Sequence, residues 1–268
     1  MGTLLKRLRP DAMVRTALLS LAVVSLLGCD SDANVSADAT VGADAMATLD
    51  ASVFDAAPAF PEPGFGEIMG DCDVLDDELT ADEPSIMHSV FDFSRGYVDS
   101  DEGMLTTGGQ QILDEGTAGG SSVLSEVFAF EMLRRCESAT LLKTETMISY
   151  DTVGKLTDFL AEMDSLKIGV SVTRAVGFPF DDPYELSQAT ELLQGKLGDI
   201  LESSANVSDE DRWNKQILSI LAYAPEHANV LEQAWLSLDD ATRADTIVHI
   251  IVTNGDDDFI YCNGACPQ

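Results

Sequence analysis

The chain has 268 residues, enough for one sizeable domain or two small ones, and 45% of them are apolar, which is ordinary for a protein with a buried core. The charge is more informative, because 47 acidic and 15 basic residues give a formal net charge of −32. A surface this acidic repels nucleic-acid phosphates and anionic lipid headgroups, so no nucleic-acid partner is expected. Solubility, cation binding and a basic protein partner all stay compatible with it.

The N-terminal segment is the first readable element. An apolar stretch of twelve residues, Thr16 to Leu27, follows several basic residues. It is too short to cross about 30 Å of hydrocarbon as a helix, but it is typical of a signal peptide. Leu26-Leu27-Gly28-Cys29 then forms a lipobox, in which the small Gly28 admits a signal peptidase and the Cys29 thiol accepts diacylglycerol. Residues 1–28 are therefore predicted to be a lipoprotein signal peptide, with palmitate among the acyl chains at Cys29.

Two points about this segment stay open. Met13 could be the true start, because Met13 to Gly28 is a compact signal by itself. An ordinary secretory signal with an incidental cysteine is the alternative to the lipobox. Lipidation implies attachment to a bacterial membrane without a spanning helix. Asp30 resembles an inner-membrane retention signal, but this rule differs between lineages, so the sequence does not choose between the inner and outer membranes.

Residues 29–63 are predicted to be the lipidated cysteine and a disordered acidic linker. Asp-Ala pairs recur every six residues from Asp32 to Asp50, and no Lys or Arg occurs between Arg15 and Arg95. Small residues with like charges cannot bury enough surface to offset chain entropy, and their repulsion extends the chain. A calcium-binding repeat is the alternative, but the spacing lacks the glycines and paired acids of calcium loops.

Residues 64–120 show little periodicity and are predicted to form an irregular N-terminal extension. Acidic residues surround Cys72, and Gly-Gly pairs at 108–109 and 119–120 indicate turns. The run Asp71-x-Asp73-x-x-Asp76 lacks the glycine and terminal glutamate of a calcium loop, so a solvated acidic loop is expected there.

The pattern becomes regular from Ser121 onward. Ser121 and Ser122 can cap a helix whose apolar residues recur on one face. Three strands are predicted next, at residues 140–150, 156–163 and 167–175, and the Asp164-Ser165 turn joins the last two as a hairpin.

The remaining elements alternate between helix and strand. A helix is predicted from Pro183 to about residue 203, then a strand at 217–223, a helix at 228–238 and a strand at 246–253. Short apolar strands between helices indicate a mixed central sheet that helices cover on both faces. Residues 121–268 are therefore predicted to form an α/β domain with the order α-β-β-β-α-β-α-β.

This order resembles the restriction-endonuclease-like fold of the PD-(D/E)XK superfamily. In that family a glutamate on the first helix, an aspartate on the second strand and an acid-x-lysine on the third bind Mg²⁺ and activate water. The resemblance assigns the helix position to Glu126 or Glu131 and the second-strand position to Asp158. The implied cofactor would be Mg²⁺.

The third strand departs from that motif. Ile168, Val170 and Val172 should share one face, which leaves Ser171 and Thr173 in the acid-x-lysine positions. Neither replaces a metal-binding carboxylate or a lysine. Glu162 or Glu145 could supply a relocated carboxylate, whereas the alternation places Arg174 on the opposite face from these positions.

The sequence also resembles a group of uncharacterised bacterial lipoproteins that share the signal, the Asp-Ala linker and this domain. The segments that carry this resemblance are Ser125-Glu126-Val127-Phe128, Leu156-Thr157-Asp158 and Gly169-Val170-Ser171-Val172-Thr173-Arg174-Ala175. It covers nearly the whole chain and implies no known activity.

Structural roles are the alternative for each candidate residue. Asp158, Glu162 and Asp164 could form one solvated strand edge, and Glu126 could lie on the polar face of its helix. The three histidines (His88, His227 and His249) lie on separate elements without the spacing of zinc ligands. No Gly-x-Ser-x-Gly motif accompanies the serines near residue 121.

Four cysteines remain once Cys29 is lipidated: Cys72, Cys136, Cys262 and Cys266. An even number in an oxidising compartment predicts two disulfides, and four cysteines allow three pairings. A turn sequence between Cys262 and Cys266 favours local pairing there, which leaves Cys72 with Cys136. A zinc site would need paired C-x-x-C spacings, which are absent.

These observations predict a lipid-anchored protein of the bacterial cell envelope, on the outer membrane, the cell surface or the periplasmic face. The membrane is its partner through the lipid, and the domain is expected to bind an unnamed ligand or protein rather than to catalyse a reaction, without a cofactor. One alternative is a Mg²⁺-dependent hydrolase that uses Glu126, Asp158 and Glu162. The other is a structural surface protein whose acidic face binds divalent cations.

Overall fold

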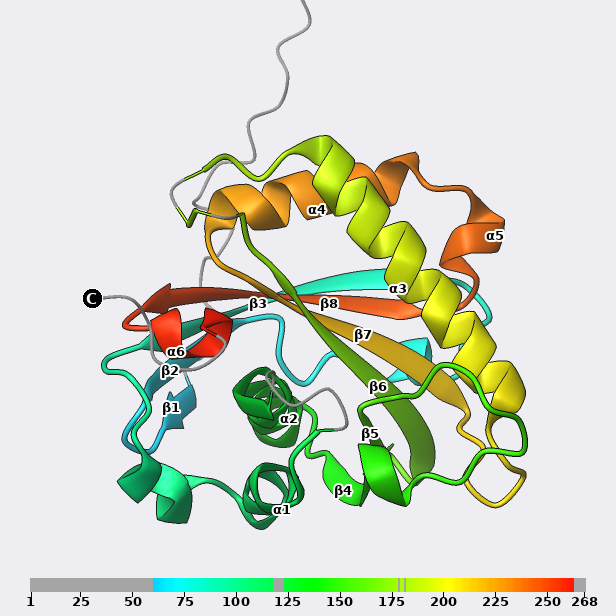
Figure 1. Cartoon of the computed structure of the whole chain (residues 1–268), viewed down its shortest axis with the longest axis horizontal. Helices are drawn as coiled ribbons and strands as arrows, with labels where there is room; N and C mark the ends of the chain where they lie inside the picture. The colour runs from blue at the N-terminus through cyan, green and yellow to red at the C-terminus, as the bar shows by residue number, and fades with distance from the viewer. Residues whose placement is uncertain (1–59, 118–122, 178, 181, 263–268) are drawn as a thin grey trace, which may run out of the picture. The chain divides into compact units, whose positions relative to one another are not determined.

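One mixed β-sheet organises the computed structural model, which describes residues 60–117, 123–177, 179–180 and 182–262 (Figure 1). Within these residues the sheet has eight strands in the order β1-β2-β3-β8-β7-β6-β5-β4. The strands are β1 (Phe60–Glu62), β2 (Gly66–Gly70), β3 (Ser85–Phe93), β4 (Thr140–Thr144), β5 (Phe159–Met163), β6 (Leu166–Ala175), β7 (Lys215–Ala222) and β8 (Ile247–Gly255). The four central strands β3, β8, β7 and β6 run parallel, and antiparallel strands extend both sides.

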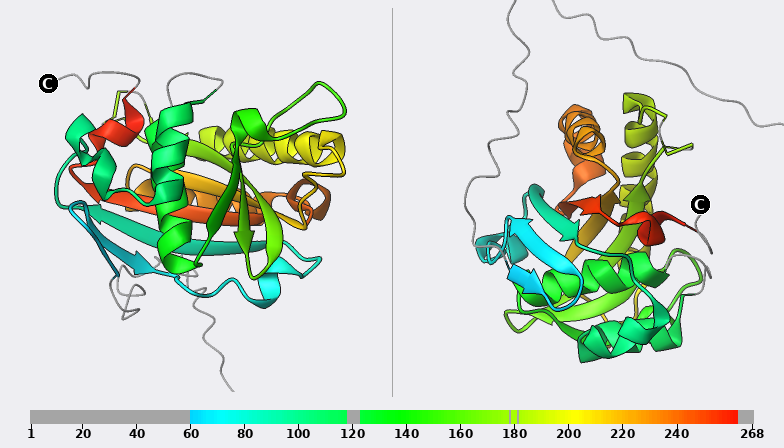
Figure 2. Two further views of the ribbon diagram at one scale, coloured as in Figure 1. Left: turned by 90° about the horizontal axis from the view of Figure 1, so that it is seen from below. Right: turned by 90° about the vertical axis from the view of Figure 1, so that its left-hand side faces the viewer.

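Helices cover both faces of the sheet (Figure 2). They are α1 (Thr107–Glu115), α2 (Val123–Cys136), α3 (Leu186–Asn206), α4 (Pro225–Ser237), α5 (Asp240–Arg243) and α6 (Asp258–Tyr261). Side chains alternate along each strand, so β7 contributes Ile217 and Leu221 to the core under α2, and Leu218 and Ile220 to the core under α3 and α4. Every residue of β7 is buried as a result. No helix in the described part of the chain is long and apolar enough to span a bilayer.

The order of elements from α2 onward confirms the predicted α/β fold class. The 164–165 hairpin is present, and Asp164 and Ser165 have φ of 49° and 65°, the left-handed conformation that a tight two-residue hairpin turn needs. Several boundaries differ from the prediction by a few residues, among them the start of β5 at Phe159 rather than at 156 and the start of α4 at Pro225 rather than at 228. The strand at 140–150 ends at Thr144, after which Glu145–Met147 forms a 3-10 turn. The third helix begins at Leu186 rather than at Pro183, because Gln188 and Glu185 cap it there.

The region from 64 to 120 differs most from the sequence prediction, since it forms β2, β3 and α1 rather than an irregular extension. β3 pairs in parallel with β8 over its whole length, from Ser85 with Ile247 to Phe93 with Gly255. β1 also begins inside the predicted linker. Residues 29–59 of that linker and the signal segment lie outside the described ranges. Parallel partners so far apart in sequence leave no local periodic signal, which explains the missed strands.

Helix α2 packs on one face of the continuous sheet, against residues of β3 as well as of β5, β6 and β7. The ring of Phe128 contacts Phe65, Phe91, Phe93 and Phe259 edge-on, with ring centroids 5.2–5.6 Å apart. All but a few residues of α2 are buried. The helix therefore has a polar, exposed side only near its end, at Arg134, and its buried charged residues must find partners inside the protein.

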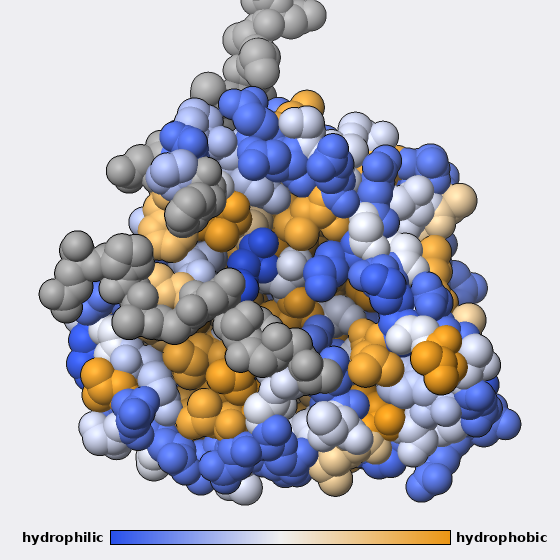
Figure 3. Space-filling model, in the orientation of Figure 1, coloured by the Kyte–Doolittle hydropathy of each residue, from blue (hydrophilic) through white to orange (hydrophobic). Residues whose placement is uncertain are grey.

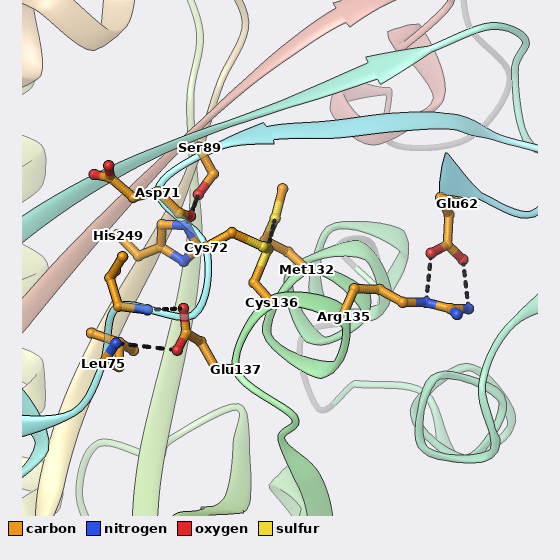
Figure 4. The surroundings of a disulfide bond; sticks show 11 residues. Glu62, Asp71, Cys72, Leu75, Ser89, Met132, Arg135, Cys136, Glu137 and His249 are labelled. Carbon is orange, nitrogen blue, oxygen red and sulfur yellow. Dashed lines mark hydrogen bonds and ion pairs between the residues drawn. A yellow bond between two sulfur atoms is a disulfide. The ribbon is translucent and has the colours of Figure 1, made fainter. Parts of the chain in front are cut away.

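A disulfide between Cys72 and Cys136 joins the loop after β2 to the end of α2 (Figure 4). The Cα atoms are 4.6 Å apart, and this pairing confirms one predicted disulfide. The Glu137 carboxylate accepts hydrogen bonds from the amides of Val74 and Leu75, which fixes the same loop a second time. The second predicted pairing includes Cys266, which lies outside the described residues, and stays a prediction.

Replacement of Cys72 and Cys136 together by serine should lower the free energy of unfolding by about 4 kcal/mol, because the bond closes a loop of 64 residues. Urea unfolding of the variant beside the oxidised protein measures the difference. A loss below about 1 kcal/mol would show that the loop is held without the bond.

Candidate functional site

The nuclease-like candidates do not come together. Glu126 is buried in α2, on the face of the sheet that carries Phe159 and Val170. Asp158 leads into β5, where the neighbouring Leu160 packs with Val207 and Trp213 on the opposite face. Glu162 is exposed and lies across from Thr140 and Lys167. Nowhere in the described ranges do three His, Cys, Asp or Glu side chains gather as a metal site would require.

Asp158 supports the sheet through its side chain. Its carboxylate accepts a hydrogen bond from the amide of Val172 at 2.6 Å, one step beyond the last backbone pair of β5 and β6, Phe159 with Val170. Burial raises the pKa of Asp158 to about 6, against the opposing effects of the Val172 amide and the nearby Lys196. The side chain thus replaces a missing strand partner.

The third-strand positions follow the predicted alternation. Val170 and Val172 belong to the core under α2, so Ser171 and Thr173 point to the face of α3. Arg174 donates to the carbonyl oxygens of Ile260 and Tyr261 in α6, at 3.1 and 3.3 Å. Its guanidinium therefore lies away from Asp158.

A buried ionic network, which no local sequence pattern indicates, holds α2. The guanidinium of Arg135 pairs with Glu62 of β1 at 2.7 Å (Figure 4). It also pairs with Glu131 at 3.5 Å. Glu131 also accepts from the amide and hydroxyl of Thr106, the residue that caps α1. Burial and the Glu131 charge raise the pKa of Glu62 to about 7, although Arg135 opposes this. The predicted nuclease-like helix glutamate, Glu131, thus anchors α1.

Two carboxylates beside one guanidinium predict an unusual pH dependence. The pKa of Glu62 is raised from 4.5 to about 7 on folding, so between these values the folded state holds a proton that the unfolded chain releases. Stability should therefore fall as pH rises through this window. Glu62→Gln, which cannot titrate, should flatten the dependence in urea unfolding at a series of pH values. Glu67→Gln, at an exposed position of β2, should keep the wild-type slope, and an unchanged slope in Glu62→Gln would contradict the assignment.

His249 has a structural partner. His249 is fully buried in β8, and its Nε2 lies 2.9 Å from the Ser89 hydroxyl. That hydroxyl donates to the Asp71 carbonyl, so Nε2 must carry the proton and donate. Burial lowers the pKa of His249 to about 3, which keeps the ring neutral. Figure 4 shows this pair next to the disulfide.

Polar and aromatic side chains do gather at the carboxyl ends of β6, β7 and β8. We call this group the carboxyl-edge cluster; it consists of Arg174, Tyr223, His227, Thr253, Asp257 and Tyr261. The chain leaves β7 towards α4 and leaves β8 towards α6, on opposite faces of the sheet (Figure 1). Such a switch point is where open α/β sheets bind ligands.

Thr253 is the centre of the hydrogen bonds in this cluster. Its hydroxyl donates to the Asp257 carboxylate and lies 2.6 Å from the Tyr261 hydroxyl. Burial raises the pKa of Asp257 and raises that of Tyr261 well above its ordinary value. Burial also lowers the pKa of Arg174. Burying a charged group in this cluster costs free energy, and hydrogen bonds to backbone and hydroxyl groups offset part of that cost.

Aromatic rings form the other half of the cluster. Tyr223 meets Tyr261 edge-on at 5.1 Å, and the His227 ring lies 5.9 Å from Tyr223 and 5.0 Å from Tyr184. His227 Nδ1 is 3.0 Å from the Ala175 carbonyl, so it carries the proton. The sequence offered one usable signal, because Tyr223 and Asp257 each follow an apolar strand at the edge where parallel strands end together.

Comparisons with known proteins give limited context. No family model matches the chain. The AAC-rich mRNA clone AAC4 protein of Dictyostelium discoideum is 37% identical over 153 residues, which are 55% of this chain and 22% of that protein. This chain therefore spans about a fifth of that relative's length. Pyrococcus furiosus SfsA in complex with Ca²⁺ is 13% identical, over 48% of this chain and 55% of its own, with a TM-score of 0.26. A likeness of that size supports no functional inference.

Proposed function

We propose that the chain is a lipid-anchored protein of the bacterial cell envelope whose nuclease-like domain binds a ligand at the carboxyl-edge cluster. The observation that carries the proposal is the convergence of Arg174, Thr253, Asp257 and two tyrosines at a switch point of the sheet. The lipobox at Leu26–Cys29 supports the anchor, and the acidic linker gives the domain reach from the membrane.

Binding is favoured over hydrolysis because two acids assigned to the nuclease motif already form structural hydrogen bonds. Asp158 completes the β5–β6 pairing, and Glu131 anchors the cap of α1. A carboxylate that already accepts backbone hydrogen bonds is a poorer ligand for Mg²⁺, which demands regular geometry. The positions of the acid and the lysine hold Ser171 and Thr173.

A cation-binding surface protein is the second candidate. A hollow of about 480 Å³ between the β1–β2 hairpin and the end of β3 has Glu62, Glu67, Asp92 and Arg95 among its lining residues. Glu62 pairs with Arg135, and Arg95 pairs with Asp101. The carboxylates of Glu67 and Asp92 therefore line the hollow without an ion pair to either arginine. Calcium titration of the protein would support this candidate if uptake were lost in Asp92→Asn.

The anchor is tested at Cys29. Cys29→Ala should abolish incorporation of labelled palmitate and leave unprocessed precursor, because the thiol is the acyl acceptor at the predicted cleavage site. Labelling in cells followed by membrane fractionation measures both effects. Unchanged palmitate labelling and processing of the variant would refute the lipobox, and Cys72→Ala serves as a control that keeps the signal intact.

Metal titrations and substitutions at Asp158 distinguish a binding domain from a hydrolase. Calorimetric titration of the wild type with Mg²⁺ or Mn²⁺ should show no saturable uptake. Asp158→Asn keeps an acceptor for the Val172 amide and should change stability by about 1 kcal/mol or less. Asp158→Ala removes the acceptor and should cost about 1–3 kcal/mol. Stoichiometric metal binding by the wild type that Asp158→Asn abolishes would establish the hydrolase instead.

A further inference from the structure

A second hollow, separate from the carboxyl-edge cluster, lies between the start of α1 and the edge strand β4; we call it the α1–β4 hollow. Its volume is about 460 Å³. Phe130, Leu105 and Ala139 are buried lining residues, so its floor is apolar. A side chain added at Gly108 would meet the Phe130 ring at 2.4 Å, so the glycine lets α1 pack directly against this buried ring at the base of the hollow.

The rim of the α1–β4 hollow differs in charge from the rest of the protein. The chain has 47 acidic residues, yet the described residues that line this hollow include none. The rim is formed by the side chains of Thr107, Gln111 and Thr140, and by Arg134, which is the one charged residue of the lining. Arg134 is thus the one charged side chain that faces the α1–β4 hollow, while the nearby carboxylates of Glu131 and Glu115 are hydrogen-bonded to Thr106 and Gln111 of its lining.

Arg134 has the donors that an anion needs. One nitrogen, Nη1, donates to the carbonyl oxygens of Ser138 and Ala139, at 3.2 and 3.5 Å. No carboxylate within the described ranges forms an ion pair with it, whereas the adjacent Arg135 pairs with two. A guanidinium presents several donors in one plane, in the arrangement that matches a carboxylate.

We propose that the α1–β4 hollow binds a small organic monocarboxylate, with its apolar body on the floor beside Phe130 and its carboxylate on Arg134. An apolar floor with one cation at the rim is complementary to an apolar molecule with one negative charge. The net charge of −32 repels a multiply charged phosphate more strongly than a monoanion, which favours a carboxylate.

Hexanoate is the probe for this site, and hexanamide is its uncharged counterpart. In calorimetric titrations of the full chain, hexanoate should bind with saturation and hexanamide at least tenfold more weakly. Arg134→Gln should weaken hexanoate binding at least tenfold and leave hexanamide unchanged. Arg212→Gln is the matched control, because it removes the same charge from an arginine that is 52% exposed and paired with Asp209.

Three results would overturn the proposal. They are the absence of saturable hexanoate binding, equal affinity for hexanoate and hexanamide, and equal weakening by Arg212→Gln and Arg134→Gln. The comparison of hexanoate with hexanamide uses the wild type alone, so it decides the matter even if Arg134→Gln fails to fold. Low-salt and high-salt titrations add a check, because a single ion pair predicts a modest salt dependence.

Discussion

The parallel pairing of β3 with β8 is the contact on which the rest of the structure depends. It joins residues 85–93 to residues 247–255, with the chain between them forming most of the other elements. Through β3, the sheet gains β2 and β1. β3 supplies Phe91 and Phe93 to the aromatic group around Phe128, and the turn between β1 and β2 supplies Phe65. Without this pairing α2 would keep a solvent-facing side. The face of the molecule drawn in Figure 3 is mainly hydrophilic at its outline and has apolar residues towards its centre.

The enclosure of α2 also determines what the acidic residues can do. A glutamate on an exposed helix face is free to bind a ligand, but Glu131 and Glu62 are buried and need Arg135 and Thr106 as partners. These interactions and the Cys72–Cys136 disulfide fasten the N-terminal strands to α2. The residues proposed to bind ligands lie instead in the carboxyl-edge cluster and around the α1–β4 hollow.

From residue 121 onward, the helices and strands were predicted from local patterns of apolar residues and turn residues. The β5–β6 hairpin and the strands β7 and β8 were predictable because their apolar runs and turn residues are contiguous in sequence. β3 was not, because its partner lies about 160 residues away and supplies no local signal. The ionic network was missed for the same reason, since Glu62 and Arg135 are separated by 73 residues. Cysteine counting did predict the Cys72–Cys136 bond. For the candidate site, Asp158 was predicted on the second strand and lies one residue before β5, whereas the carboxyl-edge cluster depends on which strands are neighbours.

Hydrogen exchange of the backbone amides tests this account most directly. If the β3–β8 pairing holds the domain together, amides of β3 should exchange as slowly as those of β8 and β7, because all three would open only with the whole sheet. Mass spectrometry of peptides that cover 85–93, 215–222 and 247–255 measures the comparison. Fast exchange in 85–93 beside slow exchange in the other two segments would contradict the account, since β3 would then be an extension that the domain does not need.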